Sequence, residues 1–334
     1  MQCQPPVQSG LRWFKGNVHA HSDRSDGRLP PGALADWYGS HGYDFLAITD
    51  HGRVTRLGPR PDDSRSNGLL MLPGTEVTAW DDRAGAFHHL LALLDPETLD
   101  SVASLKLGPP QQIVDQLVAG GALVFSAHPY WLGLSSAETG ALRGTHGIEV
   151  YNHLCQLERA RGYSEQQWDE LLVAGKRMWG LAVDDCHWRE HDSGGGWVMV
   201  RAHELTPAAI IGALRSGDFY STQGPDITRF AVTGDPGRPP GTEGAAEAVI
   251  ECSRCRKIVF LADRWLGAVV APERKNGGEL LVAGQYRLTG KETYVRAVCT
   301  DAEGRKAWTN PIMLPAPGAE QRQLRDLSWG GGRD

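Results

Sequence analysis

Several features that would assign this chain of 334 residues to a class are missing from it. No apolar run is long enough to span a bilayer, so no membrane partner is expected. The net charge of -6 leaves no basic excess, and we therefore expect no nucleic acid as the main partner. The first ten residues lack the basic and apolar regions of a signal peptide, so the expected location is cytoplasmic.

Cysteine is also scarce, and six residues do not make the disulfide framework of a small secreted protein. Two of them form Cys252-x-x-Cys255 inside a predicted strand, where no second such motif and no nearby histidine pair completes a zinc site. We expect simply two thiols in a β domain there, and small buried filler at Cys186. No Gly-x-Ser-x-Gly motif supplies a serine nucleophile.

The length favours two domains, and the sequence pattern changes once, at Gly224-Pro225. In residues 1–224, predicted strands alternate with predicted helices. The predicted strands are 13–22, 43–52, 68–80, 86–94, 122–129, 147–152 and 178–188. The predicted helices are 30–42, 109–121, 164–176 and 206–217. This alternation predicts an α/β domain with parallel strands and helices outside. Residues 225–315 contain short alternating segments typical of a small β-sandwich, and 316–334 is a polar tail that we expect to be flexible.

Histidines and carboxylates gather where the predicted strands end. His19 and His21 project to the same face of an extended strand, because side chains alternate with period two. Such a cluster is costly in a core strand unless a cation compensates it, and imidazole with carboxylate suits zinc, manganese or iron. The candidate ligands, in chain order, are His19, His21, Asp26, His51, Glu76, His89, His128, Asp185 and His187. The pattern predicts a metallohydrolase.

Strand parity limits the choice between adjacent candidates. His88 and His89 cannot both point inward from one strand, although parity alone does not say which of them does. Asp185 is preferred over Asp184, because Asp-x-His places Asp185 and His187 on one face. Asp50 precedes His51 and either orients that imidazole or is a plain turn aspartate.

Six segments in chain order carry these candidates: GNVHAHSDRSDGRLPP, YDFLAITDH, LPGTEVTAW, HLLALLDP, LVFSAHP and AVDDCHW. Together they resemble the successive motifs of the PHP (polymerase and histidinol phosphatase) superfamily over residues 11 to about 225. The last helix of this region and the β domain are similar to a subfamily that includes hydrolases of aryl carbamate esters. The resemblance implies a distorted seven-stranded (β/α)7 barrel, followed by the β-sandwich, with two or three divalent metal ions at the barrel mouth.

The resemblance also implies how the ligands divide. The implied first set is His19, His21, Glu76 and Asp185, the second is Glu76 as a bridge with His89 and His128, and the third is Asp26, His51 and His187. A bridging carboxylate can neutralise two cations while imidazoles complete each coordination sphere.

Substrate choice depends on residues around the ligands. Arg24 either reaches an anionic phosphate near the third set or is a solvated loop residue. Arg24 and Asp50 are the two candidate catalytic residues. Candidates for an aromatic pocket, or for packing at the barrel mouth, are Trp80, Tyr130, Trp131 and Trp188. Phosphatase branches of the family often carry Gly-Arg after Ala-His-Pro, where this chain has Tyr130-Trp131.

These observations favour a metal-dependent phosphoesterase that hydrolyses a small phosphomonoester or phosphodiester through a metal-bridging hydroxide. The alternative is a carboxyl ester, carbamate ester or amide hydrolase with the same centre, and a non-catalytic metal-binding scaffold is the third hypothesis. The expected partner is a small-molecule ester substrate. A homo-oligomer could form through the β domain.

Overall fold

The structure is a computed structural model that describes residues 10–55, 65–66, 68–83, 85–96, 105–189, 191–235, 238, 240–272 and 280–314. The chain divides into two compact units, one ending at Gly224 and one continuing from Pro225. The expected tail, residues 316–334, lies outside the described residues. In the part of the chain that the structure describes, no helix is long and apolar enough to cross a membrane.

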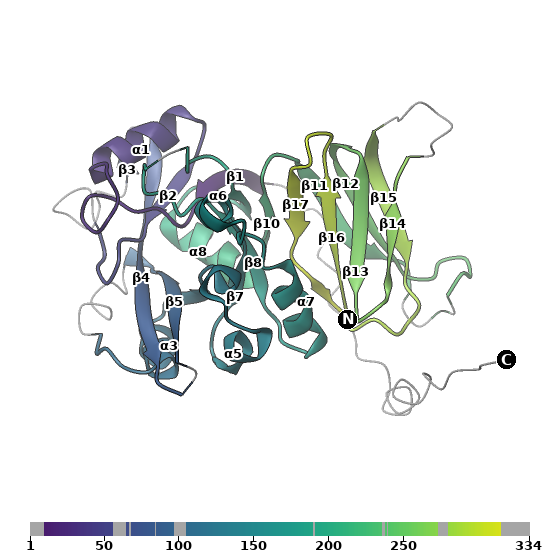
Figure 1. Ribbon diagram of the computed structural model, residues 1–334. Coiled ribbons are helices and arrows are strands. Elements are labelled where there is room, and N and C mark those ends of the chain that lie inside the picture. The colour runs from purple at the N-terminus through teal and green to yellow at the C-terminus, as the bar shows by residue number, and fades with distance from the viewer. Residues whose placement is uncertain are drawn as a thin grey trace. The chain divides into compact units, whose positions relative to one another are not determined.

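The first unit is built around one large sheet (Figure 1). Its strands are β1 (Arg12–Asn17), β2 (Phe45–Ile48), β3 (Arg65–Ser66), β4 (Leu69–Asp81), β5 (Ala86–Leu93), β6 (Leu123–Ser126), β7 (Gly147–Asn152), β8 (Trp179–Val183), β9 (Trp197–Ala202) and β10 (Phe219–Thr222). They are hydrogen-bonded in the order β10-β9-β1-β2-β4-β5-β6-β7-β8, and β3 pairs with β4. The two ends of this order approach each other at Ser221, whose hydroxyl accepts from Ala182 N at 2.8 Å and donates to Gly180 O at 2.7 Å.

The helices of this unit follow the terminal signals in the sequence. They are α1 (Pro31–Ser40), α3 (Pro110–Ala119), α4 (Pro129–Leu132), α5 (Ser136–Ala141), α6 (His153–Arg159), α7 (Glu165–Val173) and α8 (Pro207–Ser216). Thr206 caps α8 by accepting a hydrogen bond from Ala209 N, and the helix ends at Gly217, which has a φ of 83°. The four helices predicted from the sequence are confirmed as α1, α3, α7 and α8.

The sheet is mixed, whereas the sequence predicted parallel strands. Strands β1, β2 and β4 are parallel neighbours, and so are β6, β7 and β8. Strands β4 and β5 are antiparallel, because the turn between Asp81 and Ala86 is far too short for the crossover that parallel strands need. Strand β9, which the sequence analysis did not predict, pairs antiparallel with both β1 and β10.

A buried apolar core fills the first unit beneath the strand ends. It includes Phe14, Phe45, Leu91, Phe125 and Leu181. The approach of the strands is close here, since a Cβ atom on Gly16 would lie 2.1 Å from the ring of Phe45. The polar side chains of most candidate ligands lie beyond this core, at or after the carboxyl ends of β1, β2, β6 and β8.

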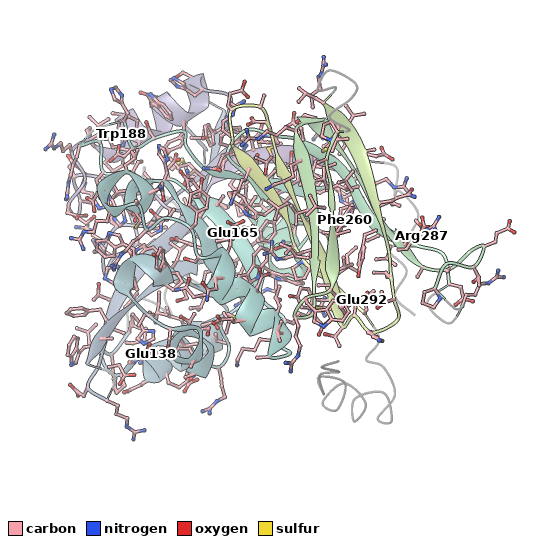
Figure 2. The ribbon with its side chains drawn as sticks, turned by 45° about the vertical axis from the view of Figure 1, so that its right-hand side comes forward. Glu138, Glu165, Trp188, Phe260, Arg287 and Glu292 are labelled. Carbon is pink, nitrogen blue, oxygen red and sulfur yellow. The ribbon has the colours of Figure 1, made fainter. Side chains whose placement is uncertain are left out.

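The second unit consists of antiparallel strands in two sheets, as its alternating segments predicted. One sheet contains β11 (Ile227–Thr233), β12 (Glu247–Cys255) and β15 (Leu281–Arg287), and the other contains β13 (Lys257–Ala262), β14 (Gly267–Val270), β16 (Tyr294–Thr300), β17 (Lys306–Thr309) and β18 (Ile312–Met313). Phe260 of β13 (labelled in Figure 2) is buried and stacks on Tyr286 of β15 with 6.0 Å between ring centroids. Side chains of the two sheets therefore meet between them. The described residues of this unit contain no helix.

Candidate metal centre

All nine candidate ligands lie on or just beyond the strands of the first unit. The backbone continues the sheet into the segments that carry them: His21 N donates to Cys186 O, and Asp185 N donates to His19 O, both at 2.9 Å. A further bridge pairs His51 with Glu76. The structure brings the nine residues into three groups whose donor atoms lie within 4.8 Å of one another and could hold a metal ion.

The first group consists of His19, His21, Glu76 and Asp185, all buried. The two Nε2 atoms are 3.1 Å apart, and Glu76 Oε2 lies 3.2 Å from each of them. Asp185 Oδ1 lies 3.2 Å from His19 Nε2 and 3.1 Å from His21 Nε2, yet it accepts no hydrogen bond. Ligands about 2.0–2.1 Å from a tetrahedral ion lie about 3.3–3.4 Å apart, so these spacings fit a shared cation.

The second group shares Glu76 with the first. Glu76 Oε1 lies 2.7 Å from His89 Nδ1 and 3.1 Å from His128 Nε2. The two oxygens of one buried carboxylate therefore face two different sets of imidazoles. His88, next in sequence to His89, is buried but belongs to none of the three groups.

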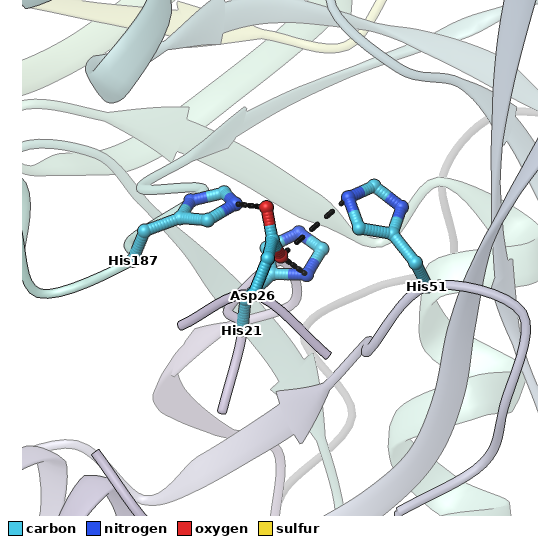
Figure 3. A group of neighbouring side chains, drawn as sticks. All are labelled: His21, Asp26, His51 and His187. Carbon is cyan, nitrogen blue, oxygen red and sulfur yellow. Dashed lines mark ion pairs between the residues drawn. The ribbon is translucent and has the colours of Figure 1, made fainter. Parts of the chain in front are cut away.

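The third group surrounds Asp26, whose carboxylate lies between imidazole rings in Figure 3. Its Oδ2 is 3.2 Å from His187 Nε2, and its Oδ1 is 3.7 Å from both His51 Nε2 and His21 Nδ1. The motif resemblance implied Asp26, His51 and His187, and the structure adds the other nitrogen of His21. The loop folds back tightly after Asp26: a Cβ atom on Gly27 would lie 2.3 Å from the carbonyl oxygen of His21.

The charges of the first group are strongly coupled. Burial disfavours the protonated form of His21, but the neighbouring carboxylates of Asp185 and Glu76 outweigh it and raise its pKa to about 9. The pKa of His19 is likewise raised, against its burial, by the carboxylates of Asp185, Glu149 and Glu76. Neighbouring imidazoles lower the pKa of Glu76 and of Asp185, in spite of their burial. Without a metal, protons shared with these imidazoles compensate the carboxylates, and a cation can take the place of those protons.

Two orienting residues were missed by the sequence analysis. Glu149 is fully buried. Its Oε1 atom lies 2.5 Å from His19 Nδ1, and its Oε2 atom accepts a hydrogen bond from His128 N at 2.8 Å. Asn152 donates to Glu149 Oε2 at 2.9 Å and to Asp185 Oδ2 at 3.0 Å. The available signal was a charged residue inside the otherwise buried strand of residues 147–152.

Three residues of the centre adopt left-handed backbone conformations. The φ angles are 28° for His128, 56° for Asp185 and 60° for Trp188. Such conformations cost about 1–3 kcal/mol in non-glycine residues and concentrate at functional sites. Asp184, the carboxylate that the parity argument set aside, turns away and accepts hydrogen bonds from the backbone N–H groups of residues 194–196.

The two candidate catalytic residues do not face the donor groups. Asp50 accepts hydrogen bonds from Ser22 N (2.7 Å), Ser22 Oγ (2.6 Å), Ser25 Oγ (2.8 Å) and the hydroxyl of Thr55. These hydrogen bonds hold the loop after His21, as those of a turn aspartate do. None of them comes from the His51 ring. Arg24 is exposed, with its Nε 3.9 Å from Asp23.

A different arginine reaches the third group. Arg189 Nη2 lies 3.2 Å from Asp26 Oδ2, and both side chains are partly exposed. Arg189 was not among the predicted site residues, although its position two residues after His187 was a signal.

The four aromatic candidates occupy different environments. The Trp131 ring lies 5.2 Å from the ring of His128, edge-on. Trp80 pairs with Phe87, Tyr130 is exposed, and Trp188 packs on Trp37 (Trp188 is labelled in Figure 2). Cys186 is buried with its Sγ 3.2 Å from the Tyr38 hydroxyl, as expected for a filler residue.

The fold of this chain is similar to that of solved structures, whereas its sequence matches no family model and no curated protein. Among solved structures, a two-domain protein from Bacteroides vulgatus, described as containing a predicted PHP-like metal-dependent phosphoesterase, is similar with a TM-score of 0.50 and 15% identity, over 93% of this chain and 97% of that one.

Two further solved structures match about half of this chain. An amidohydrolase from Chromobacterium violaceum, with bound sulfate and no metal, has a TM-score of 0.42 and 17% identity over 53% of this chain and 89% of that one. A candidate metal-dependent phosphoesterase from Bifidobacterium adolescentis has a TM-score of 0.36 and 22% identity over 55% of this chain and 89% of that one. At the level of the fold, the chain is therefore similar to the two-domain protein from Bacteroides vulgatus.

Proposed function

We propose that this chain is a metal-dependent phosphoesterase acting on a small phosphomonoester or phosphodiester. The observation that carries the proposal is Glu76, which lies between two sets of imidazoles and faces each with one carboxylate oxygen. The resemblance to the Bacteroides vulgatus protein, described as containing a predicted phosphoesterase of this kind, supports it. The finer picture of a distorted seven-stranded barrel, like the cytoplasmic location, stays a prediction.

The donor chemistry fits two or three divalent ions of the zinc, manganese or iron type. When bound, such ions would activate a water molecule and polarise the ester oxygen. The residues that would hold them are the three groups described above. Glu149 and Asn152 would keep His19 and Asp185 oriented, so that their free donor atoms point into the centre.

The chain's own contribution to substrate binding is a cation at the edge of the centre. Arg189 pairs with Asp26 and is partly exposed, so its guanidinium can also contact an anion from solvent. Guanidinium groups suit phosphate oxygens, because their donors match the oxygens in pairs. This favours a phosphate ester over a neutral ester.

A second candidate function is hydrolysis of a carboxyl ester, a carbamate ester or an amide. The Trp131 ring beside His128 favours it, because an aromatic ring next to the donor groups can receive an apolar or aromatic substituent. The non-catalytic scaffold is the weakest hypothesis, since all nine candidate ligands are present and converge.

The test is an assay of the manganese- or zinc-loaded protein on p-nitrophenyl phosphate, bis-p-nitrophenyl phosphate and an aryl methylcarbamate. Phosphate ester hydrolysis that a chelator and His128→Ala both abolish supports the proposal. Turnover of the carbamate alone refutes it in favour of the second candidate. Bound metal, shown by elemental analysis, without turnover of any substrate would favour a scaffold.

A further inference from the structure

A further group of side chains that could hold a metal ion lies in the C-terminal unit. Cys252 and Cys255 belong to β12 and Cys299 belongs to β16, and their three sulfur atoms lie within 4.8 Å of one another. All three residues are buried, and none forms a disulfide. The sequence predicted two packed thiols here for lack of partners, and the tertiary structure supplies a third thiol.

The fold brings the thiols together in two ways. On a regular strand, residues three apart point to opposite faces. Here the register is irregular: Glu251 faces Ala283 and Cys255 faces Leu281, so four steps along β12 match two along β15. This irregularity lets Cys252 and Cys255 both turn inward. Cys299 comes from the opposite sheet, where it pairs with Ile258 and Ala307.

We propose that Cys252, Cys255 and Cys299 form a three-sulfur site for a thiophilic monovalent cation, with Cu(I) as the representative ion. Thiolates are soft ligands and select such ions. Three sulfurs about 2.3 Å from an ion at their centre lie about 4.0 Å apart, a spacing compatible with this cluster. The chain then carries a site of its own in the β-sandwich unit, separate in its ligands from the histidine centre.

The coordination number decides between soft ions. Structural zinc is almost always four-coordinate, with four protein ligands in a closed site. Among the described residues no fourth histidine, cysteine or carboxylate joins the three sulfurs. The burial of all three residues also leaves little access for a water ligand. A cation that is stable with three sulfur ligands is therefore favoured over zinc.

The site would join the two sheets of the sandwich. Two of its ligands come from the sheet of β12 and one from the sheet of β16, so a bound ion links strands that no backbone ladder connects. A ligand that binds only the folded state raises the free energy of unfolding. Cu(I) is therefore expected to raise the melting temperature of this unit.

The test is a competition experiment on the full-length chain without oxygen, its histidine centre preloaded with manganese. Cu(I) is supplied as its bicinchoninate complex. We expect the chain to withdraw one Cu(I), and Cys299→Ser or Cys252→Ser to weaken this uptake at least about tenfold. The matched control is Cys155→Ser, which removes a buried cysteine of the first unit and should leave uptake unchanged. Equal uptake by the wild type and by Cys299→Ser would overturn the proposal.

A measurement on the wild type alone covers the case in which a serine variant fails to fold. X-ray absorption at the copper edge should show three sulfur neighbours at one distance. Nitrogen neighbours would place the copper in the histidine centre and refute the proposal. Preferential uptake of Zn(II) over Cu(I) by the cysteines would refute it as well.

Discussion

The Nδ1 atom of His19 lies 2.5 Å from Oε1 of Glu149, and both side chains are fully buried. The contact assigns the proton of the neutral imidazole to Nδ1 and leaves Nε2 free to face Glu76 and Asp185. A carboxylate behind a ligand imidazole fixes its tautomer and orientation and makes it more basic. Glu149 is thus a positioning residue for the candidate metal centre.

Replacing this carboxylate should weaken metal binding. For Glu149→Gln we expect divalent metal affinity to fall about 10–100-fold, the usual cost of removing such a partner. Glu158→Gln, at an exposed position of α6, is the matched control. Isothermal titration of the chelator-treated proteins with zinc measures both. Equal affinities for the two variants would show that Glu149 does not position a ligand.

Adjacent histidines offer a second matched pair. His89 contacts Glu76, whereas His88 is buried away from the donor groups. His89→Gln should therefore lose about one metal ion per chain, while His88→Gln keeps the wild-type metal content. Elemental analysis after gel filtration gives the content directly. If His88→Gln lost the metal and His89→Gln kept it, the assignment of His89 as the ligand would be wrong.

The raised pKa of His21 predicts how the stability of the metal-free protein depends on pH. Its pKa of about 9 in the folded state exceeds the ordinary value of 6.5, so the folded state binds more protons between these values. The stabilisation is fully present below pH 6.5 and is lost as the pH rises through 9. We therefore expect the free energy of unfolding to fall between pH 6.5 and 9.

Urea denaturation at several pH values measures this fall, and His21→Gln should reduce it. Metal binding must displace the same protons, so divalent metal affinity should rise with pH over the same interval. Stability of the metal-free protein that stayed constant from pH 6.5 to 9 in the wild type would contradict the prediction.

The choice between two arginines tests the substrate class. Arg189 reaches the third donor group and Arg24 does not. Arg189→Met should raise the KM for a phosphate ester about tenfold or more, because a charge-assisted hydrogen bond contributes about 1.5–3 kcal/mol. Arg24→Met should leave the KM unchanged. Steady-state kinetics with p-nitrophenyl phosphate compares them, and a reversed order of effects would restore the original prediction for Arg24.

Two glycines predict stability changes of opposite sign. A Cβ atom on Gly16 would overlap the Phe45 ring, so Gly16→Ala should lower the free energy of unfolding by about 1–3 kcal/mol. Gly212 lies exposed in α8, where a Cβ atom would meet nothing within 4 Å. Gly212→Ala should therefore raise the free energy of unfolding by about 0.5–1 kcal/mol. Thermal or urea denaturation reports both, and a shift of the same sign in the two variants would refute the argument.

Local patterns were sufficient for much of this protein. Helix α8 was predictable because Thr206-Pro207 and Gly217 mark its ends, and β1 because its apolar run ends in His19-x-His21. Side-chain alternation excluded that His88 and His89 share one face, because alternation depends only on neighbouring residues. The candidate ligands could thus be named from short segments.

Contacts between distant segments could not be found in this way. Glu149 reaches His19 across 130 residues, and Arg189 reaches Asp26 across 163. The antiparallel pairing of β9 with β1 likewise joins segments that carry no mutual signal in sequence. Such pairings depend on how the whole sheet closes, which single-segment patterns do not specify.

By itself, then, the sequence determined which residue types stand at the strand ends, because strand period and terminal signals are local properties of the chain. Only the tertiary structure showed the contacts that no motif implied. It set Glu149 behind His19, added His21 to the third donor group, and added Cys299 to the pair on β12. The physical reason is that a metal-binding group is defined by distances of a few ångströms between donor atoms, and those distances arise only when the sheets fold.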